Sequence, residues 1–359
     1  MAYPRIAIPM PASIDSYGPI AQHTVAITQV IQILQGARRQ GLDIDTALWR
    51  AGISPGLLES PLSRVTQMQY AQLMRVLART MRDELWGLTP HRMRPGSFIR
   101  ICSQLIHCRT LGEAVRTGLG LYRLLPQVFT PRLLVAGDVA RIQVTHRENQ
   151  VDAPESYAMR TFCFMSYGVM SWLTARRIPV LCVGVPSGKG YRSEAERLMR
   201  TRIRYTSNCA SLEFEAHWLA LPVVQTAESL QAFIREVPGN LVIKYRDRSR
   251  LSERIRRLLR QQALVDGVTL EEVGRHLGMT PQTVRRHLKA EGQSFQGIKD
   301  NLRRDAAIQL LARPDLTLND IAAQLGYSEA STFHRAFKSW TGLAPGMYRD
   351  ANLKPAAVR

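Results

Sequence analysis

The strongest constraint on the fold is a pattern that occurs twice between residues 269 and 349. The first copy reads LEEVGRHLGMT over residues 270–280, and the second reads LNDIAAQLGYS over residues 318–328. Apolar residues at steps of three and four give each copy a first helix with one buried face. The glycine in each copy, Gly278 or Gly326, favours the left-handed conformation that ends a helix. Each copy therefore predicts a helix, a turn and a second helix.

The second helix of each copy is expected to begin at a capping residue. Thr280 and Ser328 can accept a hydrogen bond from the next turn of backbone, and Pro281 suits the first position of a helix. Thr269 and Glu272 can form a capping box at the start of the first copy. Two helices joined by a glycine turn are the sequence form of a helix-turn-helix, whose second helix enters the major groove of DNA.

The second helices carry side chains that can read bases. Val284 and Leu288 in the first copy, and Phe333 and Phe337 in the second, are four residues apart and are expected to face inward. The residues that then point outward are Gln282, Thr283, Arg285, Arg286 and Lys289 in the first copy, and Ala330, Ser331, His334, Arg335 and Lys338 in the second. Arginine can form two hydrogen bonds to guanine and glutamine can form two to adenine, and small residues can contact the thymine methyl group. Exposed basic residues on one helix fit a solvated surface equally well, but two copies in the same arrangement favour double-stranded DNA as a partner.

The residues around the second copy resemble a known family. The chain continues from Ser331 through Phe333, Arg335 and Phe337 to a terminal pattern of Gly342, Pro345, Tyr348 and Arg349. This resembles the signature of the AraC/XylS family of bacterial transcription regulators, although Ala344 stands where the family often has serine. The resemblance implies an all-α domain with two helix-turn-helix units joined by a long helix. It also implies sequence-specific DNA binding and contact with RNA polymerase.

The sequence predicts the joining helix independently. Apolar residues recur at steps of three and four over residues 295–311, and a preceding helix is predicted at about residues 250–262. Seven arginines lie between residues 246 and 260. They fit phosphate contacts beside the first helix-turn-helix or a solvated helix face, and the sequence leaves both interpretations open.

The charge of the chain agrees with a nucleic-acid partner. The 359 residues carry a formal net charge of +19, and residues 240–359 hold 21 Lys and Arg against 12 Asp and Glu. About half of the positive excess therefore lies in one third of the chain. Positive charge near phosphates releases counterions and gives affinity that does not depend on base sequence.

The first two thirds of the chain predict an α+β domain with helices first and a small sheet later. The predicted helices are 25–40, 45–51, 67–83, 110–122, 156–176 and 193–201, and the predicted strands are a hairpin at 132–146 and segments at 179–185 and 210–214. The stretch from Gly41 and Asp43 through Ile53 to Pro61 and Val65 resembles the arabinose-binding-like N-terminal domain of some AraC-type regulators. That resemblance implies effector sensing, dimerisation or both.

These patterns divide the chain into five parts. They are a disordered lead (1–22), an effector-sensing and dimerisation domain (23–225), a linker (226–246), the double helix-turn-helix domain (247–352) and a tail (353–359). The long helix predicted at 156–176 is rich in methionine and aromatic residues. Such a helix can wall an apolar effector pocket, although this density is more typical of a simple core. The sequence names neither the effector nor the residues that would contact it.

Several classes of function find no support. Five cysteines at irregular spacings predict neither a disulfide framework nor a metal site, and no cofactor is expected. No apolar stretch approaches the length of a membrane span, and no secretory signal is evident, so a cytoplasmic protein is expected.

The chain is therefore predicted to be a sequence-specific transcription regulator, an activator and a homodimer, and not an enzyme. The alternatives are a catalytic front domain fused to the DNA-binding module, which turnover by residues 1–225 would reveal, and a purely architectural DNA binder, which two distinct recognition helices disfavour.

Overall fold

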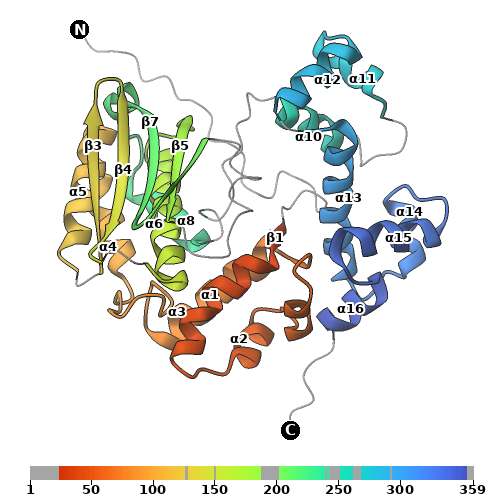
Figure 1. The fold of residues 1–359 in the computed structure, drawn as a ribbon, viewed down its shortest axis with the longest axis horizontal. Helices are drawn as coiled ribbons and strands as arrows, with labels where there is room; N and C mark the ends of the chain where they lie inside the picture. The colour runs from red at the N-terminus through yellow and green to blue at the C-terminus, as the bar shows by residue number, and fades with distance from the viewer. Residues whose placement is uncertain are drawn as a thin grey trace.

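The computed structural model shows an α+β front half followed by an all-helical back half (Figure 1). It describes residues 24–125, 128–148, 151–186, 202–238, 241, 251–261, 268–291 and 293–353. The fold class predicted from the sequence is confirmed. Within these residues no helix combines the length and the apolar character that crossing a bilayer requires.

The front half begins with helices that close around a short two-stranded ribbon. The elements are β1 (Thr24–Ala26), α1 (Ile27–Arg39), α2 (Ile44–Arg50), the 3-10 helix η2 (Pro55–Glu59), β2 (Arg64–Thr66) and α3 (Gln67–Met81). Strands β1 and β2 pair antiparallel, with Val25 opposite Val65. Helix α3 begins at a capping box in which Thr66 and Gln69 each satisfy a backbone N–H of the other. The apolar faces of α1 and α3 form one core with the ribbon.

A five-stranded sheet with helices on one face follows. Its elements are α4 (Ser97–Leu105), α5 (Leu111–Arg123), β3 (Phe129–Ala136), β4 (Val139–His146), α6 (Ala153–Leu173), β5 (Val180–Pro186), β6 (Arg202–Thr206), β7 (Cys209–Glu215), the 3-10 helix η3 (Ala216–Ala220) and α8 (Ala227–Glu236). The strand order is β3-β4-β7-β5-β6, and only the β5–β6 pair is parallel. Along β4 the residues alternate between buried and half-buried, so one face of the sheet packs on α5 and α6.

The sequence located most of the front elements but missed those without a strong apolar period. The helices at α1, α2, α3, α5 and α6, the hairpin and the strands β5 and β7 are confirmed to within a few residues, whereas β1, β2, α4 and β6 were not predicted. The predicted helix at 193–201 and the lead at 1–22 lie outside the described residues. Short strands and short helices carry too few residues for a period to stand out.

The stretch predicted as a linker, 226–246, contains an ordered helix. Helix α8 starts at a capping box formed by Thr226 and Ser229, and Phe233 stacks on Trp172 of α6 with ring centroids 4.2 Å apart. Leu230 and Phe233 are buried in the same core as the sheet. Residues 227–236 are therefore part of the packed front half and not a linker, because their apolar face covers the end of α6.

The back half is a chain of short helices around one long one. Its elements are α10 (Leu251–Gln261), α11 (Leu270–Leu277), α12 (Pro281–Ala290), α13 (Phe295–Leu311), α14 (Leu318–Gln324), α15 (Ala330–Thr341) and α16 (Pro345–Leu353). Helix α13 is the predicted joining helix and has 17 residues, which corresponds to about 26 Å. The two helix pairs α11–α12 and α14–α15 lie toward its opposite ends (Figure 1).

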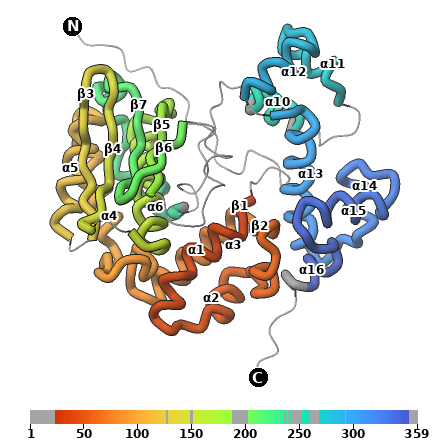
Figure 2. The backbone as a smooth tube through the Cα atoms, viewed as in Figure 1, coloured from red at the N-terminus to blue at the C-terminus, as the bar shows by residue number. Residues whose placement is uncertain are grey.

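The two halves touch along the β1–β2 ribbon, as the backbone trace makes clear (Figure 2). The hydroxyl of Tyr348, in α16, donates a hydrogen bond to the carbonyl oxygen of Arg64 in β2. The hydroxyl of Thr24, in β1, donates to the carboxylate of Asp305 in α13 at 2.6 Å. The buried residues of the front helices and of the back half form one continuous apolar cluster. The ribbon thus joins the front half to the helix that carries both helix-turn-helix units.

Candidate nucleic-acid interface

The first helix-turn-helix unit has the local structure that its sequence predicts. Thr269 and Glu272 form the capping box of α11, with backbone N–H to side-chain distances of 2.9 and 3.2 Å. Gly278 ends α11 in the left-handed conformation, with φ of 64°. The Thr280 hydroxyl then accepts from the backbone N–H of Thr283 and caps α12. These signals set the start and end of α11 and the start of α12.

The second unit repeats this architecture with one difference. Thr317 and Asp320 form a capping box on α14, which the sequence reasoning missed although the residue types and spacing were those of the first copy. The hydrogen bond from the Thr317 hydroxyl lowers the pKa of the Asp320 carboxyl. The prediction that Ser328 caps α15 is wrong. The residue before α15 is Glu329, which is extended and makes no side-chain capping bond, because α15 begins four residues after Gly326 whereas α12 begins three residues after Gly278.

The inward and outward faces of α12 and α15 lie where the sequence places them. Val284, Leu288, Phe333 and Phe337 are all buried. The outward residues that are exposed are Gln282, Arg285, Arg286, Lys289, Ser331, Arg335 and Lys338, and those that are half-buried are Thr283, Ala330 and His334. Thr283 also shares a 2.8 Å hydrogen bond with the capping Thr280, so its hydroxyl already has a partner. Each helix therefore presents a polar or basic face away from its core.

The contact between the two halves leaves the outward face of α15 open. Ser60, which follows η2, donates a hydrogen bond to the carbonyl oxygen of Thr341 at 2.9 Å. Thr341 is the last residue of α15, whereas the exposed Ser331, Arg335 and Lys338 lie along the face that precedes it. The docked front half thus touches the end of this helix and does not cover its exposed side chains.

The arginine-rich segment before the first unit divides into structural and exposed residues. Arg256 is only 7% exposed and donates to the Gln293 amide oxygen at 2.8 Å, so it ties α10 to the turn after α12. Arg257 is exposed and Arg254 is half-buried. The arginines at 246, 248 and 250, and the side chain at 260, lie outside the described residues. Burial of Arg256 removes it from the group that could contact phosphate.

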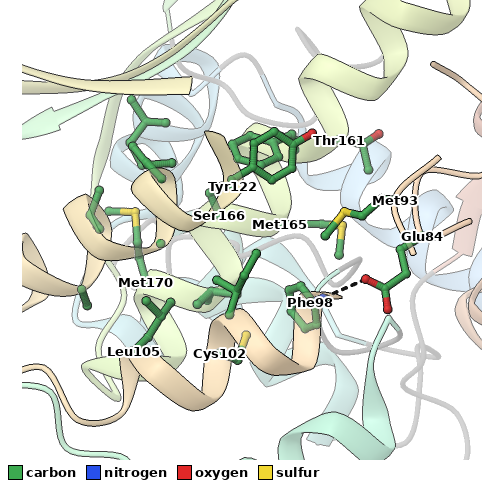
Figure 3. A pocket seen from close by; sticks show the side chains of 18 of the residues that line it. Glu84, Met93, Phe98, Cys102, Leu105, Tyr122, Thr161, Met165, Ser166 and Met170 are labelled. Carbon is green, nitrogen blue, oxygen red and sulfur yellow. Dashed lines mark hydrogen bonds between the residues drawn. The ribbon is translucent and has the colours of Figure 1, made fainter. Parts of the chain in front are cut away.

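A cavity in the front half is the feature that sequence reasoning left unresolved. It has a volume of about 120 Å³ and lies between α4, α5 and α6 (Figure 3). Phe162, Met165 and Met170 from α6 line it, whereas Met159 and Tyr167 of the same helix are buried core residues. The methionine-rich helix therefore serves both as core and as cavity wall. Because α4 was not predicted, the sequence could not show that a third wall existed.

Glu84 and Cys102 are ionisable residues in the cavity wall, and burial disfavours the charged form of each. Burial raises the pKa of the Glu84 carboxyl, whose oxygens accept hydrogen bonds from the backbone N–H groups of Gly96 at 2.6 Å and Phe98 at 2.8 Å. Burial, with a smaller contribution from Glu84, raises the pKa of the Cys102 thiol to about 12. A thiol in this state remains protonated at neutral pH and behaves as a small apolar group.

The part of the chain that the structure describes offers no metal centre and no disulfide. No group of three or more His, Cys, Asp or Glu side chains among these residues has the arrangement of a metal site. All five cysteines are free thiols.

Comparison with known proteins agrees with this architecture. The family described as the arabinose-binding domain of AraC transcription regulators, N-terminal, matches residues 41–223, and a helix-turn-helix domain family matches residues 273–351. The ornithine utilization regulator of Pseudomonas aeruginosa is 26% identical over 310 residues, which cover 84% of this chain and 89% of that protein. The regulator VqsM of the same organism is 25% identical over 241 residues, covering 60% of this chain and 70% of that one. The crystal structure of CdpR, also from Pseudomonas aeruginosa, aligns at 18% identity over 90% of this chain and 98% of that chain, with a TM-score of 0.29.

The front-domain match covers half of the chain and the helix-turn-helix match covers the units described above. The resemblance expected from the sequence is thus confirmed in both halves. The relatives are transcription regulators, and the back half has the two exposed, basic second helices that such regulators place on DNA. The chain belongs to the AraC family of DNA-binding transcription regulators.

Proposed function

We propose that α12 and α15 are the base-reading helices of this regulator. The observation that carries the proposal is that each helix has an apolar face and a basic face on opposite sides. The apolar pair of each helix is buried. The opposite side exposes Arg285 and Arg286 in α12, and Arg335 and Lys338 in α15. Recognition helices that enter successive major grooves on one side of DNA are about 34 Å apart. A rigid α13 of 17 residues supports a separation of this order.

The two helices are proposed to contribute unequally. Helix α12 offers Gln282, Arg285 and Arg286, which suit paired hydrogen bonds to adenine and guanine. Helix α15 offers smaller side chains and Arg335 as its arginine. We infer that the first unit sets most of the specificity and that the second anchors the complex, on the side nearer to RNA polymerase at promoters where the protein activates transcription.

Arginine-to-alanine variants test the reading helices. Arg286→Ala and Arg335→Ala are each expected to weaken specific binding by about 1–3 kcal/mol and to relax the base preference at one position. Lys338→Ala is expected to weaken binding evenly across sequences, because a lysine near phosphate contributes affinity without base selection. Bound sites mapped across the genome of the native bacterium would supply the operator, and titrations on single-base variants of it would measure both effects.

The matched control for these variants is Arg257→Ala. Arg257 is exposed on α10 and lies on neither reading helix. It is expected to leave the base preference unchanged. If Arg286→Ala and Arg335→Ala preserved the full base preference of the parent protein, the assignment of these residues as base readers would be wrong.

We propose that the front half controls the DNA-binding half through an effector and through dimerisation. The domain limits that this requires are residues 23–225, extended by α8, for the regulatory domain and residues 247–352 for the DNA-binding domain. The contact of β1 and β2 with α13 and α16 supports the proposal, because it links the regulatory domain to both helix-turn-helix units through packed residues.

The β3 edge of the five-stranded sheet is the proposed dimer contact. Strand β3 ends the strand order, and its Leu134 and Val135 are 42% and 50% exposed. An edge strand with exposed apolar residues is a template for pairing with a second chain. Val135→Lys is expected to raise the dimer dissociation constant about tenfold or more, because a charge would lose water at the contact.

Sedimentation equilibrium of the full chain measures this effect. Leu124→Lys is the control, because Leu124 is 80% exposed and belongs to the end of α5 and not to strand β3. It should leave the dissociation constant unchanged. A parent protein that remained monomeric at micromolar concentration, with and without DNA, would rule out the dimer.

A further inference from the structure

We propose that the cavity between α4, α5 and α6 is the effector site, and that it takes a small, uncharged, mainly apolar molecule with one hydrogen-bonding group. The inference rests on the proposed effector control and adds the chemical class of the ligand. Three independent features of the cavity carry it: an apolar wall and, among the residues that the structure describes, a lining without cations and a buried hydroxyl without a partner.

The wall is apolar along its length. Figure 3 shows Phe98 and Leu105 of α4 facing the cavity together with Met165 and Met170 of α6. Phe98 and Leu105 are seven positions apart on one helix, so the cavity extends about 10 Å along α4. Methionine side chains are flexible and adapt to ligands of irregular shape. A compact aliphatic or aromatic molecule fits these walls.

The residues that line the cavity disfavour an anionic ligand. Among the residues that the structure describes around the cavity, none is a lysine, arginine or histidine. An anionic ligand would have to bury its charge without a partner and beside the Glu84 carboxyl. A cation is also disfavoured, since the Glu84 oxygens already accept two backbone hydrogen bonds and burial shifts this carboxyl toward its neutral form. The charge pattern thus selects an uncharged ligand.

The Tyr122 hydroxyl supplies the polar recognition group. Tyr122 is 3% exposed and lines the cavity from α5, and its hydroxyl oxygen has no hydrogen-bond partner among the described residues. Burial raises the pKa of this phenol well above its ordinary value, so it remains neutral and can donate a hydrogen bond. A buried polar group without a partner is costly, and a ligand oxygen that accepts from it would remove the cost. Ser166 and Thr161, from α6, also line the cavity and can assist.

The cavity is connected to the contact between the two halves. Trp86, Met93 and Tyr122 line it, and they belong to the same apolar cluster as Val65 of β2 and Tyr348 of α16. A ligand that repacks this wall acts on the core that supports the ribbon. Effector binding is therefore expected to change the affinity of the full-length protein for DNA.

Three probes of equal chain length test the class of ligand: octanol, octanoate and octylamine. Each is titrated into the full-length protein by displacement of the uncharged fluorescent probe N-phenyl-1-naphthylamine. Octanol is expected to bind about tenfold or more tightly than either charged analogue, because the lining residues include no cation for the carboxylate and the Glu84 oxygens that could face the ammonium group already accept two backbone hydrogen bonds. Tighter binding of octanoate or octylamine, or binding of none of the three, would overturn the proposal.

Two variants locate the site. Tyr122→Phe removes only the hydroxyl and is expected to weaken octanol binding about threefold to tenfold while leaving the Tm of the free protein unchanged or higher. Ethylbenzene, which has no hydrogen-bonding group, should bind parent and variant equally. Ser166→Phe fills the cavity and should abolish binding of both ligands. Unchanged octanol binding in both variants would contradict the assignment.

Measurements of DNA binding distinguish a wrong assignment of the cavity from a wrong proposal of effector control. If octanol binds as expected but does not alter DNA affinity, the cavity is a ligand site and the proposed regulation is wrong. If the three probes fail to bind while DNA binding is intact, the cavity assignment is wrong and the reading helices are unaffected.

Discussion

Replacement of Gly274 by leucine is expected to disrupt the first helix-turn-helix unit and to abolish specific DNA binding. A Cβ atom on Gly274 would lie 2.5 Å from the carbonyl oxygen of Met279 and 3.6 Å from the backbone nitrogen of Pro281. The Met279 oxygen belongs to the backbone of the turn, which cannot withdraw as a flexible side chain can, whereas the Pro281 nitrogen at the start of α12 would be in ordinary van der Waals contact. Overpacking of this kind costs about 1–3 kcal/mol and in some cases more. The turn would have to open, and α12 would lose its orientation.

Thermal unfolding and operator titration of the Gly274→Leu variant measure this effect, and the second unit provides the matched control. Ala322 occupies the corresponding place in α14 and is buried. Ala322→Gly adds no atoms, so it should cost only about 1 kcal/mol through helix propensity and keep DNA binding. A Gly274→Leu protein with the parent Tm and the parent affinity for DNA would show that the close approach of α11 to the turn does not prevent a larger side chain at position 274.

The second large effect is expected from Tyr348→Ala. Tyr348 is fully buried, its ring lies nearly perpendicular to that of Phe337 with centroids 5.2 Å apart, and its hydroxyl bonds the Arg64 carbonyl. Truncation of a buried aromatic residue to alanine typically costs about 3–5 kcal/mol. We expect the second helix-turn-helix unit to lose its cooperative unfolding transition and the contact with β2 to be lost. Calorimetry of the full-length chain and hydrogen exchange of residues 60–66 measure the two consequences.

The Tyr348→Phe variant distinguishes the effect of ring packing from the effect of the hydrogen bond between the two halves. It keeps the ring against Phe337 and removes only the hydrogen bond to Arg64, which is worth about 1 kcal/mol. The variant should fold and bind operator DNA, yet exchange its amides faster around β2. If Tyr348→Ala lowered the stability no more than Tyr348→Phe, the ring would not be the anchor of this core.

The helix-turn-helix units were predictable because their signals are local. Thr269, Glu272, Gly278 and Thr280 act within one or two turns of the chain, and each occupies the place that its side chain or backbone freedom requires. The buried pair Val284 and Leu288 then orients α12. The prediction at Ser328 failed because one extra residue between the glycine and the second helix moves the start of α15 without changing the spacing of the apolar pair.

The cavity and the contact between the halves were not predictable in this way. Helix α4 has nine residues, follows Gly96 without a side-chain cap and was missed, so one wall of the cavity was absent from the predicted elements. The surroundings of the Tyr122 hydroxyl, which has no partner among the described residues, depend on side chains from α5 and α6 that are distant along the chain. A periodic pattern reports which face of one helix is buried, but not which helix covers it.

The amino-acid sequence by itself determined the duplicated helix-turn-helix, the exposed polar faces of α12 and α15, and the division into an α+β part and an all-α part. Capping residues, glycine turns and apolar periods act over a few residues, so they can be recognised without the fold. Only the tertiary structure decided that α8 packs on α6, that Arg256 is buried, and that an apolar cavity forms between α4, α5 and α6. These features arise where segments far apart in the chain exclude water from one another, and long-range packing leaves no local period.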